Sequence, residues 1–322
     1  MSSADTAAPE VVTCGEAMIL MLAAEDRPLA HAGRYDAMIA GAESNVAIGL
    51  ARLGHRVAFF GKVGDDVFGE QVRRDLRAEG VDVTHLSSDP DRPTGLLFRD
   101  TVVGSPITVH YCRAGSAATA MSVADVPRGL VEQARLLHVT GITAALSEVA
   151  FEATLETIRL ARASGVHVSL DPNLRLRLAS RERWQVLIDA LARECDVVLT
   201  GVEEAEVFTG GADPVGWLRD RGVGTVVIKR GAEGATEDDL RSGERVAAQP
   251  ARAVPLVDPV GAGDAFDAGW LSGWLRGLPA TDRLREAAAV ASLVVASRGD
   301  SAGLPSAALR DRVLAEGSDV ER

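Results

Sequence analysis

The chain has 322 residues, of which 47% are hydrophobic and 25% charged, a composition typical of a soluble globular protein with a large core. Its formal net charge of −12 argues against nucleic acid and anionic membranes as general partners. That charge does not exclude an anionic substrate, because local donors dominate within a Debye length of about 8 Å.

The sequence predicts a cytoplasmic protein. No apolar run reaches the roughly 20 residues of a membrane helix, and residues 1–10 lack the charged and apolar regions of a signal peptide. Cys14, Cys112 and Cys195 are isolated and odd in number, which fits a reducing compartment and no metal-ligand spacing. The length is ordinary for one α/β enzyme with an insertion, so a single domain over 1–322 is expected.

The first part of the chain alternates short extended runs with helices. The predicted strands are Val11–Cys14, Met18–Leu22, Gly33–Ala40 and Val57–Phe60. Ser44 is expected to cap a helix that Gly54 closes. Residues 61–66 are expected to turn the chain into another helix, which ends near Gly80.

The pattern changes between residues 95 and 113. Gly95–Val102 and Ile107–Arg113 are β-type runs around Gly104-Ser105-Pro106, which predicts a hairpin instead of a crossover helix. With the runs at 18–22 and 33–40, this hairpin is expected to form a small sheet outside the main one. The lid strands are therefore inserted at about 17–40 and 95–113.

From residue 136 onward strands and helices alternate, which predicts a parallel sheet with helices on both faces. Ligands of such sheets gather at the carboxyl ends of the strands. Several polar residues follow strands directly and are expected to face one crevice: Asp171, Arg175, Glu204, Lys229 and Asp264.

The segment Val257–Phe266 is the most informative stretch. It is expected to leave a strand at Ala253–Val257, pass Gly261 and Gly263, and enter a helix over Asp264–Leu275. Glycines allow close backbone approach, and the free N–H groups of a helix start bind anions. A carboxylate there repels phosphate, so Asp264 either acts as a general base or caps the helix.

These motifs resemble the ribokinase-like (PfkB-type) carbohydrate kinases over nearly the whole chain. Residues 258–266 (Asp-Pro-Val-Gly-Ala-Gly-Asp-Ala-Phe) are similar to the C-terminal signature of that family, and residues 41–54 to its N-terminal signature. Residues 61–69 are similar to the strand and turn that follow. The resemblance implies a three-layer α/β/α fold with a mostly parallel sheet and a β lid.

The resemblance also implies the chemistry, namely transfer of the γ-phosphoryl group of ATP, with Mg²⁺, to a sugar hydroxyl. Asp264 would be the base, and the amides of Gly261, Ala262 and Gly263 would hold the transferring phosphoryl. Further implied roles are substrate binding by Gly41, Ala42 and Asn45, ATP binding by Lys229, Gly231 and Gly234, and a metal contact by Glu204.

Two further stretches resemble the 2-keto-3-deoxygluconate kinase branch, Tyr111–Ala118 and Asp171–Arg175. In that branch, residues matching Tyr111, Arg113 and Arg175 hold an acid sugar. Independently, two guanidinium groups converging on one pocket favour a planar anion over a neutral sugar. The alternative is that both arginines are solvated, as most are.

The chain departs from the family pattern at a few positions: Ala40, Leu97, Gly201 and Ala288. Leu97 replaces a lid tyrosine, and Gly201 replaces an asparagine, which weakens the metal assignment to Glu204. The remaining hypotheses are a kinase for fructose or ribose and a catalytically weak binding protein. A nicotinamide-dependent dehydrogenase is rejected, because no Gly-x-Gly-x-x-Gly follows the first strand. Exposed lid edges suggest a homodimer through the lid.

Overall fold

The computed structural model describes residues 8–25, 27–100, 102 and 107–316. Within them the main sheet has nine strands in the order β13-β12-β11-β10-β9-β8-β1-β4-β5. Its strands are β1 (Val11–Gly15), β4 (Val57–Gly64), β5 (Leu86–Asp89), β8 (Leu136–Thr140), β9 (His167–Asp171), β10 (Val197–Gly201), β11 (Thr225–Lys229), β12 (Ala235–Asp239) and β13 (Glu244–Gln249). All pairs are parallel except β11/β12 and β12/β13, so the predicted mostly parallel sheet is confirmed.

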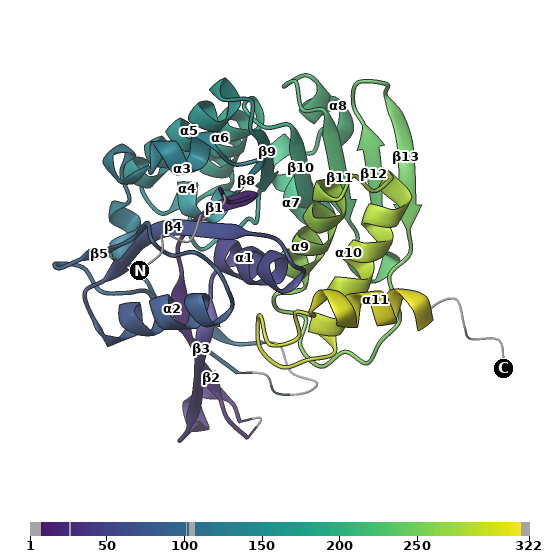
Figure 1. Cartoon of the computed structure of the whole chain (residues 1–322). Coiled ribbons are helices and arrows are strands. Elements are labelled where there is room, and N and C mark those ends of the chain that lie inside the picture. Colours follow the sequence, from purple (N-terminus) through teal and green to yellow (C-terminus); the bar gives the residue numbers. More distant parts are fainter. Residues whose placement is uncertain (1–7, 26, 101, 103–106, 317–322) are drawn as a thin grey trace, which may run out of the picture.

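Helices cover both faces of the main sheet, as Figure 1 shows. They are α1 (Ala42–Arg52), α2 (Val67–Ala78), α3 (Arg128–Glu132), α4 (Gly141–Ala145), α5 (Glu148–Ala163), α6 (Arg181–Ala192), α7 (Val202–Thr209), α8 (Pro214–Arg219), α9 (Ala262–Leu275), α10 (Ala280–Val295) and α11 (Ala307–Glu316). Neighbouring strand residues enter different cores, since Val11 and Phe59 pack with α1, α9 and α10 while Val12 and Phe60 pack with α5 and α6. This alternation is the physical basis of the three layers.

A separate four-stranded sheet has the order β3-β2-β6-β7 and projects away from the main sheet, where Figure 1 shows β2 and β3. Its strands are β2 (Met18–Ala23), β3 (Tyr35–Ala40), β6 (Leu96–Arg99) and β7 (Val109–Cys112). β6 and β7 are antiparallel, which confirms the hairpin; its predicted turn at 104–106 lies outside the described residues. We call this sheet the lid.

Three local predictions were wrong. Ala253–Val257 is not a strand, because no ladder partner is available there and the amides of Val257 and Asp258 bond to the carbonyl of Val295 instead. Ser44 does not cap α1, which begins after Gly41; the Ser44 hydroxyl lies inside the helix and donates to the Gly41 carbonyl.

The third wrong prediction concerns the end of β4. The strand continues through Gly64, because β5 pairs with residues 61–64 in parallel register. The turn into α2 is therefore short, and the side chain of Asp66 caps that helix by accepting from the amides of Phe68 and Gly69.

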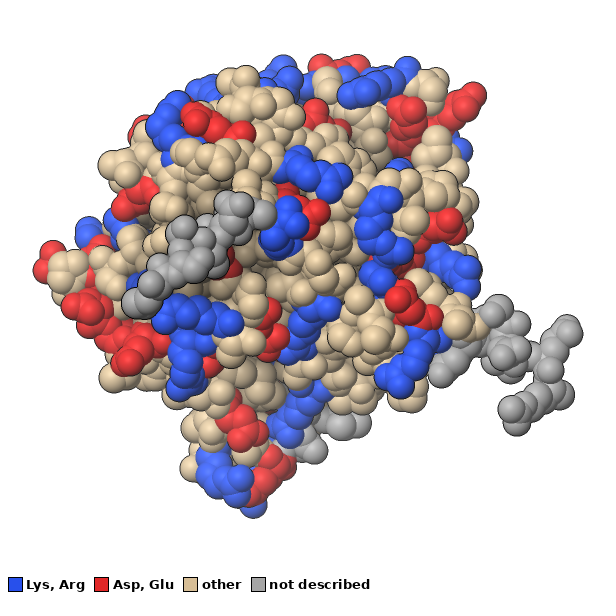
Figure 2. Space-filling model, viewed as in Figure 1, with Lys and Arg blue, Asp and Glu red and all other residues tan. Residues whose placement is uncertain are grey.

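Acidic and basic side chains are interspersed over the face shown in Figure 2, so charge alternates in sign across that surface. Cys14, Cys112 and Cys195 are all free thiols. No helix in the described part of the chain is long and apolar enough to cross a membrane.

Candidate active site

A cavity of about 930 Å³ lies between the lid and the carboxyl ends of the main-sheet strands, within the usual size range of ligand sites. Every residue predicted for the site lines it. On the lid side and the α1 side these are Gly41, Ala42, Asn45, Tyr111 and Arg113; at the main-sheet side they are Arg175, Glu204, Lys229, Gly231, Gly234, Gly261, Ala262, Gly263 and Asp264. The five residues expected at strand ends, namely Asp171, Arg175, Glu204, Lys229 and Asp264, therefore line one cavity.

The loop before α9 is held by a close backbone approach. Gly261 is the N-cap residue with φ 82°, a left-handed conformation that favours glycine, and a Cβ there would lie 2.2 Å from the carbonyl oxygen of Asp300. The first amide that bonds back to Gly261 is that of Ala265. The amides of Gly263 and Asp264 consequently have no acceptor within the helix and can donate to an anion. We call residues 261–263 the anion loop.

Asp264 is buried at the third position of α9, and no side chain caps this helix, so the capping interpretation is wrong. Its two carboxylate oxygens accept hydrogen bonds from Asn45 Nδ2 at 2.8 Å and Asn173 Nδ2 at 3.2 Å. Burial raises the pKa of Asp264 to about 7, although the hydrogen bond from Asn45 opposes that rise. A carboxylate with a near-neutral pKa is well suited to accept a proton from an alcohol.

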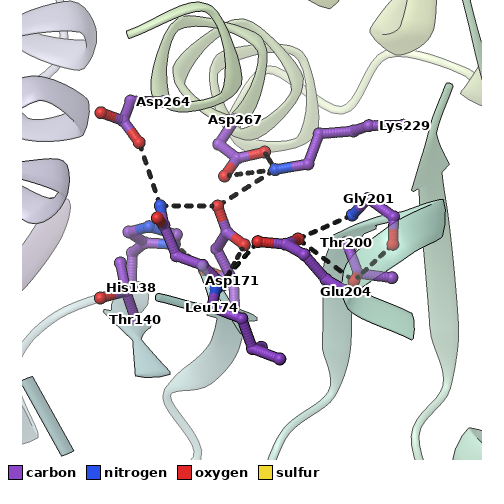
Figure 3. A network of polar contacts seen from close by, with 12 residues as sticks. His138, Thr140, Asp171, Leu174, Thr200, Gly201, Glu204, Lys229, Asp264 and Asp267 are labelled. Carbon is purple, nitrogen blue, oxygen red and sulfur yellow. Dashed lines mark hydrogen bonds and ion pairs between the residues drawn. The ribbon is translucent and has the colours of Figure 1, made fainter. Parts of the chain in front are cut away.

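Behind Asp264 lies a buried charge cluster, drawn in Figure 3. Lys229 Nζ donates to Asp171 at 3.0 Å and to Asp267 at 3.1 and 3.2 Å. Burial alone would lower the pKa of Lys229, but the carboxylates of Asp171 and Asp267 raise it above its usual value. Asp267 was not identified from sequence, although its spacing of three residues from Asp264 on one helix was an available signal.

Glu204 is the third residue of α7, and its carboxylate accepts from the amides of Leu174 at 2.9 Å and Gly201 at 2.8 Å (Figure 3). It thus ties the loop after β9 to the start of α7. Among the described residues no group of three or more His, Cys, Asp or Glu side chains could hold a metal ion by itself. A metal at this position would therefore need further ligands from a bound phosphate or from water.

The two predicted arginines differ in their surroundings. Arg113 is buried, forms a short ion pair with Glu16, and lies with its guanidinium carbon 5.5 Å from the Tyr111 ring centre. Arg175 is exposed at the cavity, and within the described chain the one hydrogen bond of its guanidinium group is to the carbonyl of Leu174. Of the two arginines, Arg175 is therefore the one without an ion pair to a carboxylate within the described residues.

Two asparagine side chains that line this cavity have oxygens without a hydrogen-bond partner in the described part of the chain. Within the described residues, Asn45 Oδ1 and Asn173 Oδ1 are buried without a hydrogen-bond partner, and both residues line the cavity. Buried acceptors are costly unless they are satisfied, so hydroxyl groups of a bound ligand suit them. The side chain of Leu97, in contrast, contributes an apolar surface from the lid.

The pH dependence of turnover follows from the surroundings of Asp264. If Asp264 is the general base, it acts when deprotonated, so kcat/KM should rise with pH to about 7 and fall about tenfold per pH unit below it. Asn45→Leu removes a hydrogen bond that lowers this pKa, so the acid limb should move to higher pH. Asp171→Asn removes a charge that raises the pKa, so the limb should move to lower pH.

Profiles of kcat/KM against pH for the parent and both variants test this. Titration of the substrates is common to all three proteins and cancels in the comparison. Shifts of the same sign, or an unchanged limb in both variants, would contradict the assignment of the limb to Asp264.

The layered fold, the lid and a cavity in which a buried carboxylate lies beside the N-terminus of a helix are the arrangement expected of a phosphotransferase of the sugar kinase type. Residues 8–307 match the family model "pfkB family carbohydrate kinase". The chain belongs to the pfkB family of carbohydrate kinases, and the predicted family and enzyme class, an ATP-dependent carbohydrate kinase, are confirmed.

Similar proteins agree with this family. The chain is 38% identical over 306 residues to a 2-dehydro-3-deoxygluconokinase of Bacillus subtilis (strain 168), covering 92% of each chain. It is 34% identical to a 2-dehydro-3-deoxygluconokinase of Thermoproteus tenax, covering 92% of this chain and 91% of that one. Among solved structures, a PfkB protein from Polaromonas sp. JS666 superposes with a TM-score of 0.84 at 38% identity, over 94% of this chain and 99% of that one.

Proposed function

We propose that this protein phosphorylates a sugar acid, 2-keto-3-deoxygluconate, to 2-keto-3-deoxy-6-phosphogluconate with ATP as donor. The observation that carries the proposal is the guanidinium group of Arg175, which has no ion pair within the described residues and lies in the same cavity as Asp264 and the anion loop. A substrate carboxylate is its natural partner. The two curated relatives named above, both 2-dehydro-3-deoxygluconokinases, support the same substrate.

In this mechanism the residues of the chain bind, orient and move one proton. Asn45 and Asn173 hold the carboxylate of Asp264 and offer their free oxygens to sugar hydroxyls. Asp264 takes the proton of the reacting hydroxyl, which makes the alcohol a competent nucleophile. The amides of Gly263 and Asp264 donate to the charge on the transferring phosphoryl group.

The nucleotide fits the other end of the cavity. Gly231 lies there with φ 54°. No atom of the described residues is within 4 Å of the position that a Cβ on this residue would occupy, so the space beside Gly231 is open. Gly234 is required for another reason, since a Cβ would lie 2.0 Å from the Gln249 carbonyl oxygen. Ala288 and Val295 line this end as small apolar surfaces suited to a base. Lys229 Nζ lies 3.8 Å from the position that a Cβ on Gly263 would occupy, so the ammonium group is beside the anion loop.

Mg²⁺ fits the donor set at Glu204, because Mg²⁺ binds proteins through one or two carboxylates together with phosphates and waters. Carboxylate oxygens that already accept one amide hydrogen each retain lone pairs for a metal or its waters. When bound with ATP, the ion neutralises charge on the phosphates.

The Glu16–Arg113 ion pair favours a second candidate, a kinase for a neutral sugar, because it neutralises one of the two expected cations. A substrate panel with ATP consumption as the readout separates the two. 2-Keto-3-deoxygluconate should be used far better than fructose or ribose. The reverse preference would contradict the acid-sugar proposal and leave the kinase class intact.

Arg175→Ala should raise KM for the acid sugar about ten- to 150-fold, because a lost charge-assisted hydrogen bond in a closed pocket costs roughly 1.5–3 kcal/mol. The KM for a neutral sugar should change little. Arg113→Ala should affect both sugars, since it leaves the buried Glu16 without its ion-pair partner. The matched control is Arg181→Ala, an exposed arginine at the start of α6. An unchanged acid-sugar KM in Arg175→Ala would exclude this residue as the carboxylate partner.

We also propose a homodimer through the lid. β3 and β7 are the edge strands of this sheet, residues 35–37 and 110–112 are exposed, and Tyr35 packs edge-on against Phe98 at 5.6 Å. Open edges with exposed aromatic residues favour association. Light scattering should give twice the chain mass, and Tyr35→Glu should shift it toward the monomer. A monomeric parent protein would contradict the proposed homodimer.

A cytoplasmic location remains a prediction.

A further inference from the structure

A buried arginine of the lid reaches the segment that leads into the anion loop. Arg99 is the last residue of β6 and is 1% exposed. Its Nη1 donates to both carboxylate oxygens of Asp258 at 2.8 Å, and its Nη2 donates to Asp300 at 2.9 Å. These partners lie 159 and 201 residues away in the chain, so the contact joins the lid to the C-terminal part of the main layer.

The two carboxylates that Arg99 holds belong to the two segments that adjoin the anion loop. Asp258 also accepts from the amides of Val260 and Gly299, each at 3.1 Å. Asp300 contributes the backbone carbonyl against which Gly261 packs. Through these contacts Arg99 fixes both the segment before the loop and the segment beneath it.

Other contacts place the same segment against the lid. The guanidinium group of Arg298 donates to the carbonyl of Ala23 at the end of β2. A Cβ on Gly299 would lie 2.7 Å from Met38 Sδ of β3, so the backbone approaches the lid closely. Residues 298–300 are thus enclosed between the lid strands and the anion loop.

The charges of Asp258 and Asp300 make the packing around the anion loop depend on Arg99. Asp258 and Asp300 are both buried, so without a cation two like charges would face each other beside the position of the transferring phosphoryl group. The guanidinium group neutralises one charge and satisfies both carboxylates in a fixed geometry. Burial raises the pKa of Asp300 to about 6, and Arg99 opposes that rise.

We propose that Arg99 is a positioning residue that couples the lid to the anion loop. When the lid is seated on the sugar, its guanidinium group holds Asp258 and Asp300, and these hold the loop amides on the transferring phosphoryl group. The inference rests on the proposed function of the loop. It adds that the lid controls turnover through the loop as well as by covering the sugar.

Kinetics of Arg99→Met and Arg99→Lys test the coupling. Arg99→Met should lower kcat about 10²-fold, as expected when a supporting contact shifts a reacting group, with the KM values for sugar and ATP changed less than about threefold. Arg99→Lys keeps the positive charge but lacks the planar set of donors of a guanidinium group, so its kcat should lie between those of Arg99→Met and the parent. Arg34→Met is the matched control, since Arg34 is an exposed lid-side arginine paired with Glu25. It should behave as the parent.

A double variant separates charge from shape. Asp300→Asn in the Arg99→Met background removes one of the two facing carboxylate charges, so it should raise kcat above that of Arg99→Met alone. A double variant no better than Arg99→Met, or worse, would contradict the charge argument.

Amide hydrogen exchange of the ligand-free protein gives a readout that does not depend on any sugar. Exchange across residues 257–264 should be faster in Arg99→Met than in the parent or Arg34→Met. Faster exchange in a protein that does not phosphorylate the acid sugar would overturn the proposed substrate and leave the coupling in place. Unchanged exchange together with a kcat within about threefold of the parent would overturn the coupling.

If Arg99→Met does not fold at the assay temperature, Asp300→Asn in the parent is the deciding variant. This variant weakens the interaction between Arg99 and residue 300, so amide exchange across 257–264 should be faster and kcat should be lower. Parental exchange and kcat in this variant would overturn the proposal.

Discussion

Asp264→Asn is expected to lower kcat by at least about 10²-fold, because the reacting hydroxyl loses its proton acceptor. The fold and sugar binding should survive. Asparagine fills the same volume and keeps one acceptor for the amide groups of Asn45 and Asn173. Asn45 can rotate its side-chain amide, since its own oxygen has no partner within the described residues, whereas Asn173 is also bonded to Asp171. The expected loss is therefore specific to turnover.

A matched control tests whether the loss reflects the position of an aspartate on a helix. Asp282 is exposed and is the third residue of α10, as Asp264 is of α9. Asp282→Asn removes the same charge from the same helical position, so it should leave kcat unchanged. The measurements are kcat for both variants and sugar binding by calorimetry. If Asp264→Asn keeps more than a tenth of the parental kcat, Asp264 is not the base.

The location of the site could be predicted because it follows from topology. In a parallel sheet the carboxyl ends of the strands meet at one edge, so Asp171 and Lys229 were expected to face Asp264 before any distance was known. The lid was predicted from a change of period between residues 95 and 113. Both signals are local in sequence: the small sheet is present, and Asp171, Lys229 and Asp264 line one cavity.

The electrostatic pairings of the site could not be predicted in the same way. Lys229 was expected to face a nucleotide, yet its charge is shared between Asp171 and Asp267. Arg113 was expected to bind the substrate, and the structure pairs it with Glu16. Such partners lie far apart in the chain, and no periodicity or motif spacing links them.

The incorrect prediction of a strand at Ala253–Val257 also comes from partners that lie far apart in the chain. An apolar run of five residues predicts a strand only if a neighbouring strand offers a ladder, and that depends on the whole sheet. Here β13 ends at Gln249, and the following segment crosses to the cavity, where Ala253 and Leu256 line the wall. Its apolar side chains thus line the site instead of forming a sheet.

The two glycines of the anion loop are expected to respond in opposite ways to an added methyl group. Gly261→Ala places a Cβ at 2.2 Å from the Asp300 carbonyl oxygen in a left-handed conformation, so the loop must move. We expect a lower Tm and a loss of at least about 10² in kcat, comparable to removing an oxyanion donor. At Gly263 the nearest atom to a built Cβ is Lys229 Nζ at 3.8 Å, so the free protein has room for it.

Gly263→Ala should therefore keep or raise Tm, because alanine in a helix is favoured over glycine by roughly 1 kcal/mol. Turnover should nevertheless fall, since the new methyl group occupies the side from which the phosphoryl group approaches the amides, and Gly263→Val should be worse. Sugar binding measured without ATP should stay near the parental value in both Gly263 variants. A Gly263→Ala protein with higher Tm, parental kcat and parental KM for ATP would show that no phosphate comes close to this residue, and the role of the anion loop would have to be abandoned.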